Sequence, residues 1–175
     1  VESKSIEMAV ADMNKFSNNY VAEMLTKAVA AIYAVPGSIP KGMVYLNSYM
    51  KSIGIDETQY FLKNPSGLTR ENKITGNAMW KLLIEMQKQF RVQSEFLSSL
   101  PIAGIDGTLK NRMKGTPAEG MVRAKTGSLT GVVSMAGYAG RKDGSAIPFV
   151  FIYNGSADES GVRSFFDKMA IALVE

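Results

Sequence analysis

Three stretches decide the fold class: GMVRAKTGSL (residues 120–129), GVVSMAGYAGR (131–141) and AIPFVFIYNG (146–155). Each is rich in β-branched, aromatic and small residues and is bounded by a glycine-containing turn, which is the pattern of short β-strands. The Asp143–Gly144 pair between the second and third stretches is typical of a hairpin turn. Together they predict an antiparallel meander over about residues 120–155.

Helical patterns flank this meander on both sides. Before it, apolar residues recur at helical spacing over residues 5–15, 20–34, 41–53 and 76–90, with Asn18 or Asn19 available to cap the second segment and Thr75 the fourth. After it, residues 158–174 form an amphipathic pattern that can cover one face of the sheet. The sequence therefore predicts an α+β fold with a helical part at about 1–119, strands at about 120–155 and a terminal helix. The expected inward side chains of that helix are Val162, Phe165, Phe166, Met169 and Ile171 or Leu173.

The composition limits the chemistry. The 175 residues are 46% hydrophobic, carry a net charge of +4, and include neither cysteine nor histidine. The absence of these two residue types excludes Ser-His-Asp and Cys-His catalysis, thiol chemistry and histidine-based metal sites. Any proton carrier in a hydrolytic reaction would therefore be lysine, serine, tyrosine or a carboxylate. The basic residues are scattered without interleaved aromatics, which argues against a nucleic-acid partner, and no apolar run has membrane-spanning length.

Two short motifs bear on function. Lys125, Thr126 and Gly127 lie in a predicted edge strand, where a glycine leaves room for another backbone to lie alongside. Ser17 and Asn19 lie in a break between two predicted helices. Alone, the first motif can be a solvated strand end and the second a helix-capping segment. Together, a Ser-x-Asn motif followed by Lys-Thr-Gly has the order found in penicillin-interacting enzymes.

Longer segments make the resemblance specific. MNKFSNNYVAEML (13–25), PSGLTRENKIT (65–75) and the run from Leu100 to Gly140 are similar to the C-terminal part of the class C low-molecular-weight penicillin-binding proteins, the D-Ala-D-Ala carboxypeptidase/endopeptidase family. The similarity covers nearly the whole chain. One departure is Asn64–Pro65, where the family more often has Asp-Gly, and it leaves the geometry of that turn open.

The resemblance implies a penicillin-binding-protein/β-lactamase-like transpeptidase fold and an acyl-enzyme mechanism on peptidoglycan stem peptides, with β-lactam antibiotics as inhibitors and no metal or cofactor. It implies that Ser17 relays a proton, Asn19 binds the acyl-side amide and Lys125 supplies positive charge. It also implies an extracytoplasmic, periplasmic location. The substrate-binding residues implied by the family are Thr126, Gly127, Ser128, Leu129 and Thr130.

Ser48 and Lys51 have the Ser-x-x-Lys spacing of the family's nucleophile, but they follow the Ser-x-Asn motif instead of preceding it. The expected apolar stripe of this predicted helix is Met43, Leu46, Met50 and Ile53. It places Ser48 and Lys51 on the opposite, solvent side. We therefore expect the nucleophile on an N-terminal segment outside these 175 residues. The alternatives are a β-lactamase, which the long family match disfavours, and a catalytically silent peptidoglycan-binding domain, which the intact Ser17, Asn19 and Lys125 set disfavours.

Overall fold

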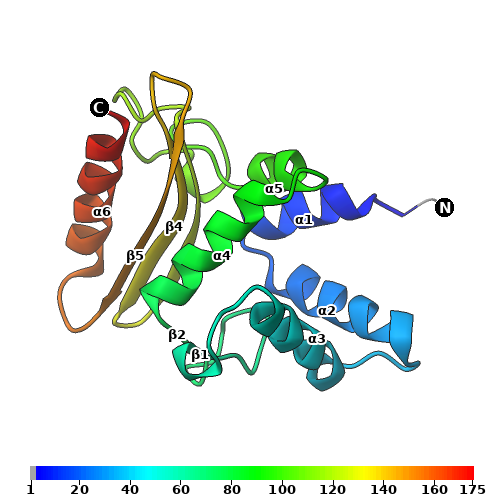
Figure 1. The fold of residues 1–175 in the computed structure, drawn as a ribbon. Helices are drawn as coiled ribbons and strands as arrows, with labels where there is room; N and C mark the ends of the chain where they lie inside the picture. The colour runs from blue at the N-terminus through cyan, green and yellow to red at the C-terminus, as the bar shows by residue number, and fades with distance from the viewer. Residues whose placement is uncertain (1–2) are drawn as a thin grey trace. The chain divides into compact units, whose positions relative to one another are not determined.

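Residues 3–175 are described by a computed structural model, in which the chain divides into two units (Figure 1). Residues 3–17 and 86–175 form the first, here called the sheet unit, and Asn18–Glu85 form the second, here called the helical unit. The helices are α1 (Ile6–Lys15), α2 (Asn19–Tyr33), α3 (Ile39–Ser52), α4 (Gly76–Lys88), α5 (Gln93–Ser99) and α6 (Glu159–Val174), with short 3-10 turns η1 (Glu57–Gln59) and η2 (Gly107–Leu109). The strands are β1 (Tyr60–Phe61), β2 (Lys73–Ile74), β3 (Val122–Leu129), β4 (Val132–Gly140) and β5 (Ala146–Asn154).

The sheet unit contains the predicted meander, with strand order β3-β4-β5 and antiparallel pairing throughout. The hairpin between β4 and β5 turns where the sequence predicted it. Gly144 has a φ of +83°, and the Asp143 carboxylate accepts hydrogen bonds from the backbone N–H and the hydroxyl of Ser145 at 2.9 and 2.6 Å. Helix α6 covers one face of this sheet (Figure 1), so the predicted α+β architecture is confirmed.

The main core lies between α6 and the sheet. Its buried members from β3, β4, β5 and α6 include Val122, Ala124, Val133, Met135, Phe149, Phe166, Ala170 and Val174. Because side chains alternate along a strand, the burial of Val122 and Ala124 places Thr126 and Ser128 on the α6 face and Lys125 on the other. One expected inward residue is wrong: Phe165 is 60% exposed, because the buried stripe of α6 runs through Phe166, Ala170 and Val174 in steps of four.

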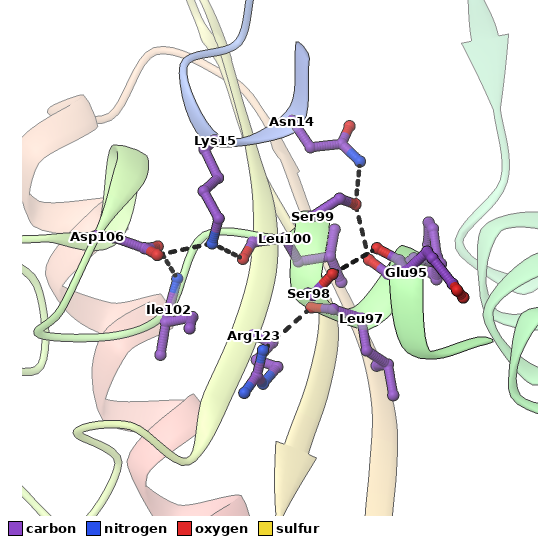
Figure 2. A network of polar contacts seen from close by, with 11 residues as sticks. Asn14, Lys15, Glu95, Leu97, Ser98, Ser99, Leu100, Ile102, Asp106 and Arg123 are labelled. Atoms are coloured by element: carbon purple, nitrogen blue, oxygen red, sulfur yellow. Dashed lines mark hydrogen bonds and ion pairs between the residues drawn. The ribbon is translucent and has the colours of Figure 1, made fainter. Parts of the chain in front are cut away.

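Helices α1 and α5 pack together within the sheet unit. The Ser5 hydroxyl caps α1 by accepting a hydrogen bond from the backbone N–H of Met8. The contact between the helices includes a buried polar pair, in which the Asn14 amide donates to the Ser99 hydroxyl at 2.8 Å (Figure 2). This satisfied pair fixes the last turn of α1 against the end of α5.

The helical unit has its own small core of Met50, Ile55 and Ala78. Asn18 caps α2, since its side-chain oxygen accepts from the backbone N–H of Val21 at 3.2 Å. The two-residue strands β1 and β2 were not predicted, because two residues are too few for an alternating pattern. No helix within residues 3–175 is long and apolar enough to cross a membrane.

Gly137 of β4 lies directly against the backbone of β3. A Cβ at this position would lie 2.1 Å from the carbonyl oxygen of Arg123 and 2.6 Å from Cα of Ala124, both backbone atoms of β3. We expect Gly137→Ala to lower the free energy of unfolding by about 1–3 kcal/mol, as overpacking does when only backbone can yield. Urea denaturation measures the change. Gly140→Ala in the same strand is the matched control, because its nearest atoms are 3.3 Å away; equal stability of the two variants would contradict the prediction.

Candidate active site

The outer edge of β3 is open in its second half. Near the strand's start a loop occupies this edge: the N–H of Ala124 donates to the Pro101 carbonyl at 3.0 Å, and the Val122 carbonyl accepts from Ala103 at 2.9 Å. Since backbone groups alternate in direction along a strand, the N–H groups of Thr126 and Ser128 point to the same edge as that of Ala124. The second half of β3 therefore presents backbone donors where an extended ligand can align.

Lys125 and Ser17 meet beside this edge, although they are 108 positions apart. The Lys125 ammonium donates to the Ser17 hydroxyl oxygen at 2.8 Å and to the Thr126 carbonyl at 2.7 Å. Lys125 is half-buried, and burial lowers the pKa of its ammonium below the ordinary value for lysine. Because the Ser17 oxygen accepts from lysine, its own O–H hydrogen remains available to donate.

Ser17 adopts a backbone conformation that residues other than glycine rarely adopt. Its φ is +52°, in the left-handed region, at a cost of the order of 1–3 kcal/mol. Asn18, not Ser17, caps α2, so capping does not account for the Ser17 side chain. Asn19 is the first residue of α2 and belongs to the helical unit. The structure thus brings Ser17 and Lys125 together within one unit and holds Ser17 in a strained conformation.

An ion pair holds the end of α1 in place, two residues before Ser17 (Figure 2). The Lys15 ammonium lies 2.7 Å from the Asp106 carboxylate and donates to the Leu100 carbonyl at 2.9 Å. The other oxygen of Asp106 accepts from the backbone N–H of Ile102 at 2.8 Å. Residues 100–106 belong to the same loop that occupies the start of the β3 edge, so these contacts tie the Ser17 segment to the strand that carries Lys125.

The α6 face of the same edge holds a polar hollow of about 350 Å³. Its lining includes Thr108, Thr126, Ser128, Arg112 and Arg163, whose side chains carry hydroxyl or guanidinium groups. Hydroxyl and guanidinium donors together suit a carboxylate. A larger hollow of about 730 Å³ lies between β5 and α6, but its lining is mainly apolar and includes none of the sequence-predicted site residues.

The remaining predicted residues lie at or just beyond the end of β3. At Gly127, a Cβ would lie 2.5 Å from the Ser134 hydroxyl of the neighbouring strand, so a larger residue would displace that side chain. That is a different reason from the expected one of leaving room for a ligand backbone. Leu129 is the half-buried last residue of β3, and Thr130 is exposed in the turn to β4.

Ser48 is exposed in the middle of α3, on the side opposite the buried Met43 and Met50. The Lys51 ammonium is directed to Glu57, 3.4 Å from its carboxylate. Within residues 3–175, no cluster of three or more carboxylates forms a metal-binding group.

Comparison with known proteins shows the family of the chain. A sequence model of the D-Ala-D-Ala carboxypeptidase 3 (S13) family matches residues 1–174. A D-alanyl-D-alanine carboxypeptidase of Actinomadura sp. (strain R39) is 36% identical over 166 residues, which are 92% of this chain and 30% of that protein. The crystal structure of penicillin binding protein 4 (dacB) from Haemophilus influenzae superposes with a TM-score of 0.84 and 29% identity, over 96% of this chain and 39% of that chain.

A second structure of the Haemophilus influenzae protein is a complex with a novel β-lactam, and it superposes with a TM-score of 0.81 and 27% identity. The superposition covers 96% of this chain and 41% of that one. The present chain thus spans about a third of the length of the relatives it matches.

The titration of Lys125 tests its burial. Because burial disfavours the charged ammonium, the pKa of Lys125 in the folded chain lies below its value in the unfolded chain. Between the two values the unfolded chain holds more protons, so the contribution of this group to stability rises with pH over that window. An NMR titration of the Lys125 side-chain Cε should give a pKa below the ordinary lysine range. Ser17→Ala should lower it further by removing an acceptor; a pKa at or above that range would contradict this.

Lys15→Met tests the ion pair at the end of α1. Losing the contacts to Asp106 and Leu100 should cost about 1–3 kcal/mol of unfolding free energy, since hydrogen bonds to charged groups contribute amounts of this size. Loosening the Ser17 segment should also hydrate Lys125 and raise its pKa in the same NMR titration. Lys4→Met is the matched control, because it removes an exposed ion pair between Lys4, just before α1, and Asp12 in that helix. A Lys125 titration unchanged by Lys15→Met would show that Lys15 does not position Ser17.

Proposed function

The chain belongs to the D-Ala-D-Ala carboxypeptidase 3 (S13) family, and from this we propose that it supplies part of the active site of a serine D-Ala-D-Ala carboxypeptidase or DD-endopeptidase. The observation that carries the proposal is the hydrogen bond between Lys125 and Ser17 beside the open edge of β3. The substrate is a peptidoglycan stem peptide that ends in D-Ala-D-Ala or is cross-linked through a D-amino acid. The proposed place of action is outside the cytoplasmic membrane.

The nucleophile in this proposal is the serine of a Ser-x-x-Lys motif on a segment of the same protein outside these 175 residues. The exposed position of Ser48 and the pairing of Lys51 with Glu57 support this assignment. So does the length of the relatives, about three times that of this chain. The contribution of this chain is then to move a proton, to bind the substrate backbone and to stabilise developing charge.

In the acylation step, the oxygen of the nucleophilic serine attacks the carbonyl carbon of the penultimate D-Ala. The lysine of the Ser-x-x-Lys motif takes the serine proton, a C–O bond forms and the C–N bond of the peptide breaks. Ser17 donates its hydroxyl hydrogen to the leaving nitrogen and takes back the proton that the motif lysine received, while the positive charge of Lys125 at 2.8 Å stabilises the negative charge that develops on the Ser17 oxygen. Water then attacks the ester carbon, which releases the shortened peptide as an acid and restores the serine.

The backbone and hydroxyl groups of β3 act on the substrate in this scheme. The N–H of Ser128 points to the open edge and provides half of an oxyanion hole, a contribution of about 3 kcal/mol per donor in enzymes of this type. The Thr126 and Ser128 hydroxyls bind the carboxylate of the leaving residue, and Gly127 keeps the strand edge narrow. Asn19 binds the acyl-side amide, and Leu129 and Thr130 line the acyl side-chain pocket.

A penicillin presents the same carbonyl and carboxylate as the D-Ala-D-Ala end, so it should acylate the same serine. We expect mass spectrometry of the protein that carries both segments to place the adduct on the Ser-x-x-Lys serine. Ser17→Ala should slow acylation or turnover about 10²- to 10⁴-fold, the usual effect of losing a proton carrier. Ser48→Ala is the matched control for loss of a serine hydroxyl at an exposed position, and it should change neither rate.

The same experiment separates the alternatives. An adduct on residues 1–175 would place the nucleophile in this chain and overturn the proposed division of the site. Rapid loss of the adduct with no release of D-Ala from a stem peptide would identify a β-lactamase. Binding of peptidoglycan without adduct or turnover would identify a silent binding domain.

A further inference from the structure

We propose that Arg163 on α6 is a second binding group for the free carboxylate of the substrate's leaving residue, and that Glu159 holds Arg163 in place before the substrate binds. This inference rests on the proposed function, because it concerns the same substrate and the same edge of β3. It assigns a role to a helix residue that neither the Ser-x-Asn nor the Lys-Thr-Gly motif contains.

Arg163 reaches β3 at the residue proposed to bind the carboxylate. Its Nη2 donates to the Ser128 hydroxyl oxygen at 2.8 Å and to the Glu159 carboxylate at 2.9 Å. Both Ser128 and Arg163 line the polar hollow on the α6 face of the strand. The Arg163 side chain is 42% exposed, and a guanidinium has five N–H donors, more than the two contacts of Nη2 use.

The contacts of Glu159 show that the donors beside Ser128 bind a carboxylate. One of its carboxylate oxygens accepts from the backbone N–H of Gly131 at 3.2 Å. The other lies 3.3 Å from the Ser128 hydroxyl and accepts from Arg163. An internal carboxylate therefore already uses the hydroxyl and guanidinium donors that a substrate carboxylate would meet. A bound substrate would compete with Glu159 for these two donors.

Arg112, the second arginine that lines the hollow, is paired with Asp167. Nε and Nη2 of Arg112 bind the Asp167 carboxylate at distances of 2.7 to 3.3 Å, and Nη2 also donates to the Arg163 carbonyl at 3.3 Å. The Arg112–Asp167 pair is about one-fifth exposed on each side. Breaking such a pair leaves a poorly hydrated charge, so Arg112 serves α6 packing while Arg163 remains available to a ligand.

This arrangement predicts how the site distinguishes an acid from an amide. The Thr126 and Ser128 hydroxyls can donate to the oxygen of either group. A guanidinium binds a carboxylate through charge as well as hydrogen bonds, and it gains much less from a neutral amide. Arg163 should therefore favour a leaving residue with a free carboxylate over the same residue with a carboxamide.

The test compares N-acetyl-D-Ala-D-Ala-type substrates as the free acid and as the C-terminal amide, in the protein that carries both this chain and the proposed nucleophile. We expect Arg163→Gln to lower kcat/KM for the acid about 10- to 100-fold, mostly through KM, and to change that for the amide less than about 3-fold. Arg163→Lys should retain part of the preference. Glu159→Gln, which removes the competing charge, should raise kcat/KM for the acid. Arg141→Gln, in the exposed β4–β5 hairpin, is the matched control.

Two results would mean that Arg163 and Glu159 form only a structural ion pair. One is an equal loss of kcat/KM for the acid and the amide in Arg163→Gln. The other is a loss of kcat/KM in Glu159→Gln as large as in Arg163→Gln.

A binding measurement separates this result from failure of the proposed function. The Ser128 amide signal in NMR is followed while the acid or the amide is added. If neither compound is hydrolysed, the proposed function fails; equal binding of the two compounds by the unaltered protein would overturn the role of Arg163.

Discussion

The ion pair between Lys15 and Asp106 is the constraint on which the candidate site depends. Lys125 of β3 holds the Ser17 side chain by a hydrogen bond, but Ser17 occupies a left-handed backbone conformation that costs of the order of 1–3 kcal/mol. The two hydrogen bonds of the Lys15 ammonium, which together are expected to contribute about 1–3 kcal/mol, are of a size to offset that cost. The strain is therefore supported by a contact outside the Ser-x-Asn motif.

Strand alternation separates two kinds of chemistry along one edge. Lys125 lies on the α1 side of the sheet, where burial lowers the pKa of its ammonium and Ser17 accepts its hydrogen bond. Thr126 and Ser128 lie on the α6 side, where the Ser128 hydroxyl accepts from the partly exposed Arg163. The lysine–serine pair and the hydroxyl–guanidinium pair therefore lie within a few residues of each other along β3 without sharing one electrostatic environment.

Much of the fold could be predicted from local pattern, because the three strands, their hairpin and the flanking helices all carry strong periodicity. The pairing of Ser17 with Lys125 was reached only through motif order, since no local pattern links residues 108 positions apart. Lys15, Asp106 and Arg163 were missed because their partners come from distant segments and only packing reveals them. Phe165 was wrongly expected to face inward for a related reason. The sequence shows an apolar stripe that includes both Phe165 and Phe166, and only the position of the sheet decides which of the two is buried.

An open strand edge normally exposes donors and acceptors alternately and invites pairing with any other strand. Here the Lys125 ammonium donates a hydrogen bond at 2.7 Å to the Thr126 carbonyl oxygen, which faces the open edge. The N–H groups of Thr126 and Ser128 point to the same edge and remain available as donors. The edge is thereby biased toward donors. A ligand matched to it offers acceptors, such as a carbonyl oxygen that becomes an oxyanion and a carboxylate beside it. The same lysine that contacts Ser17 thus also shapes what the strand can bind, which gives a physical reason for a lysine, and not an arginine with its larger planar head, at this position.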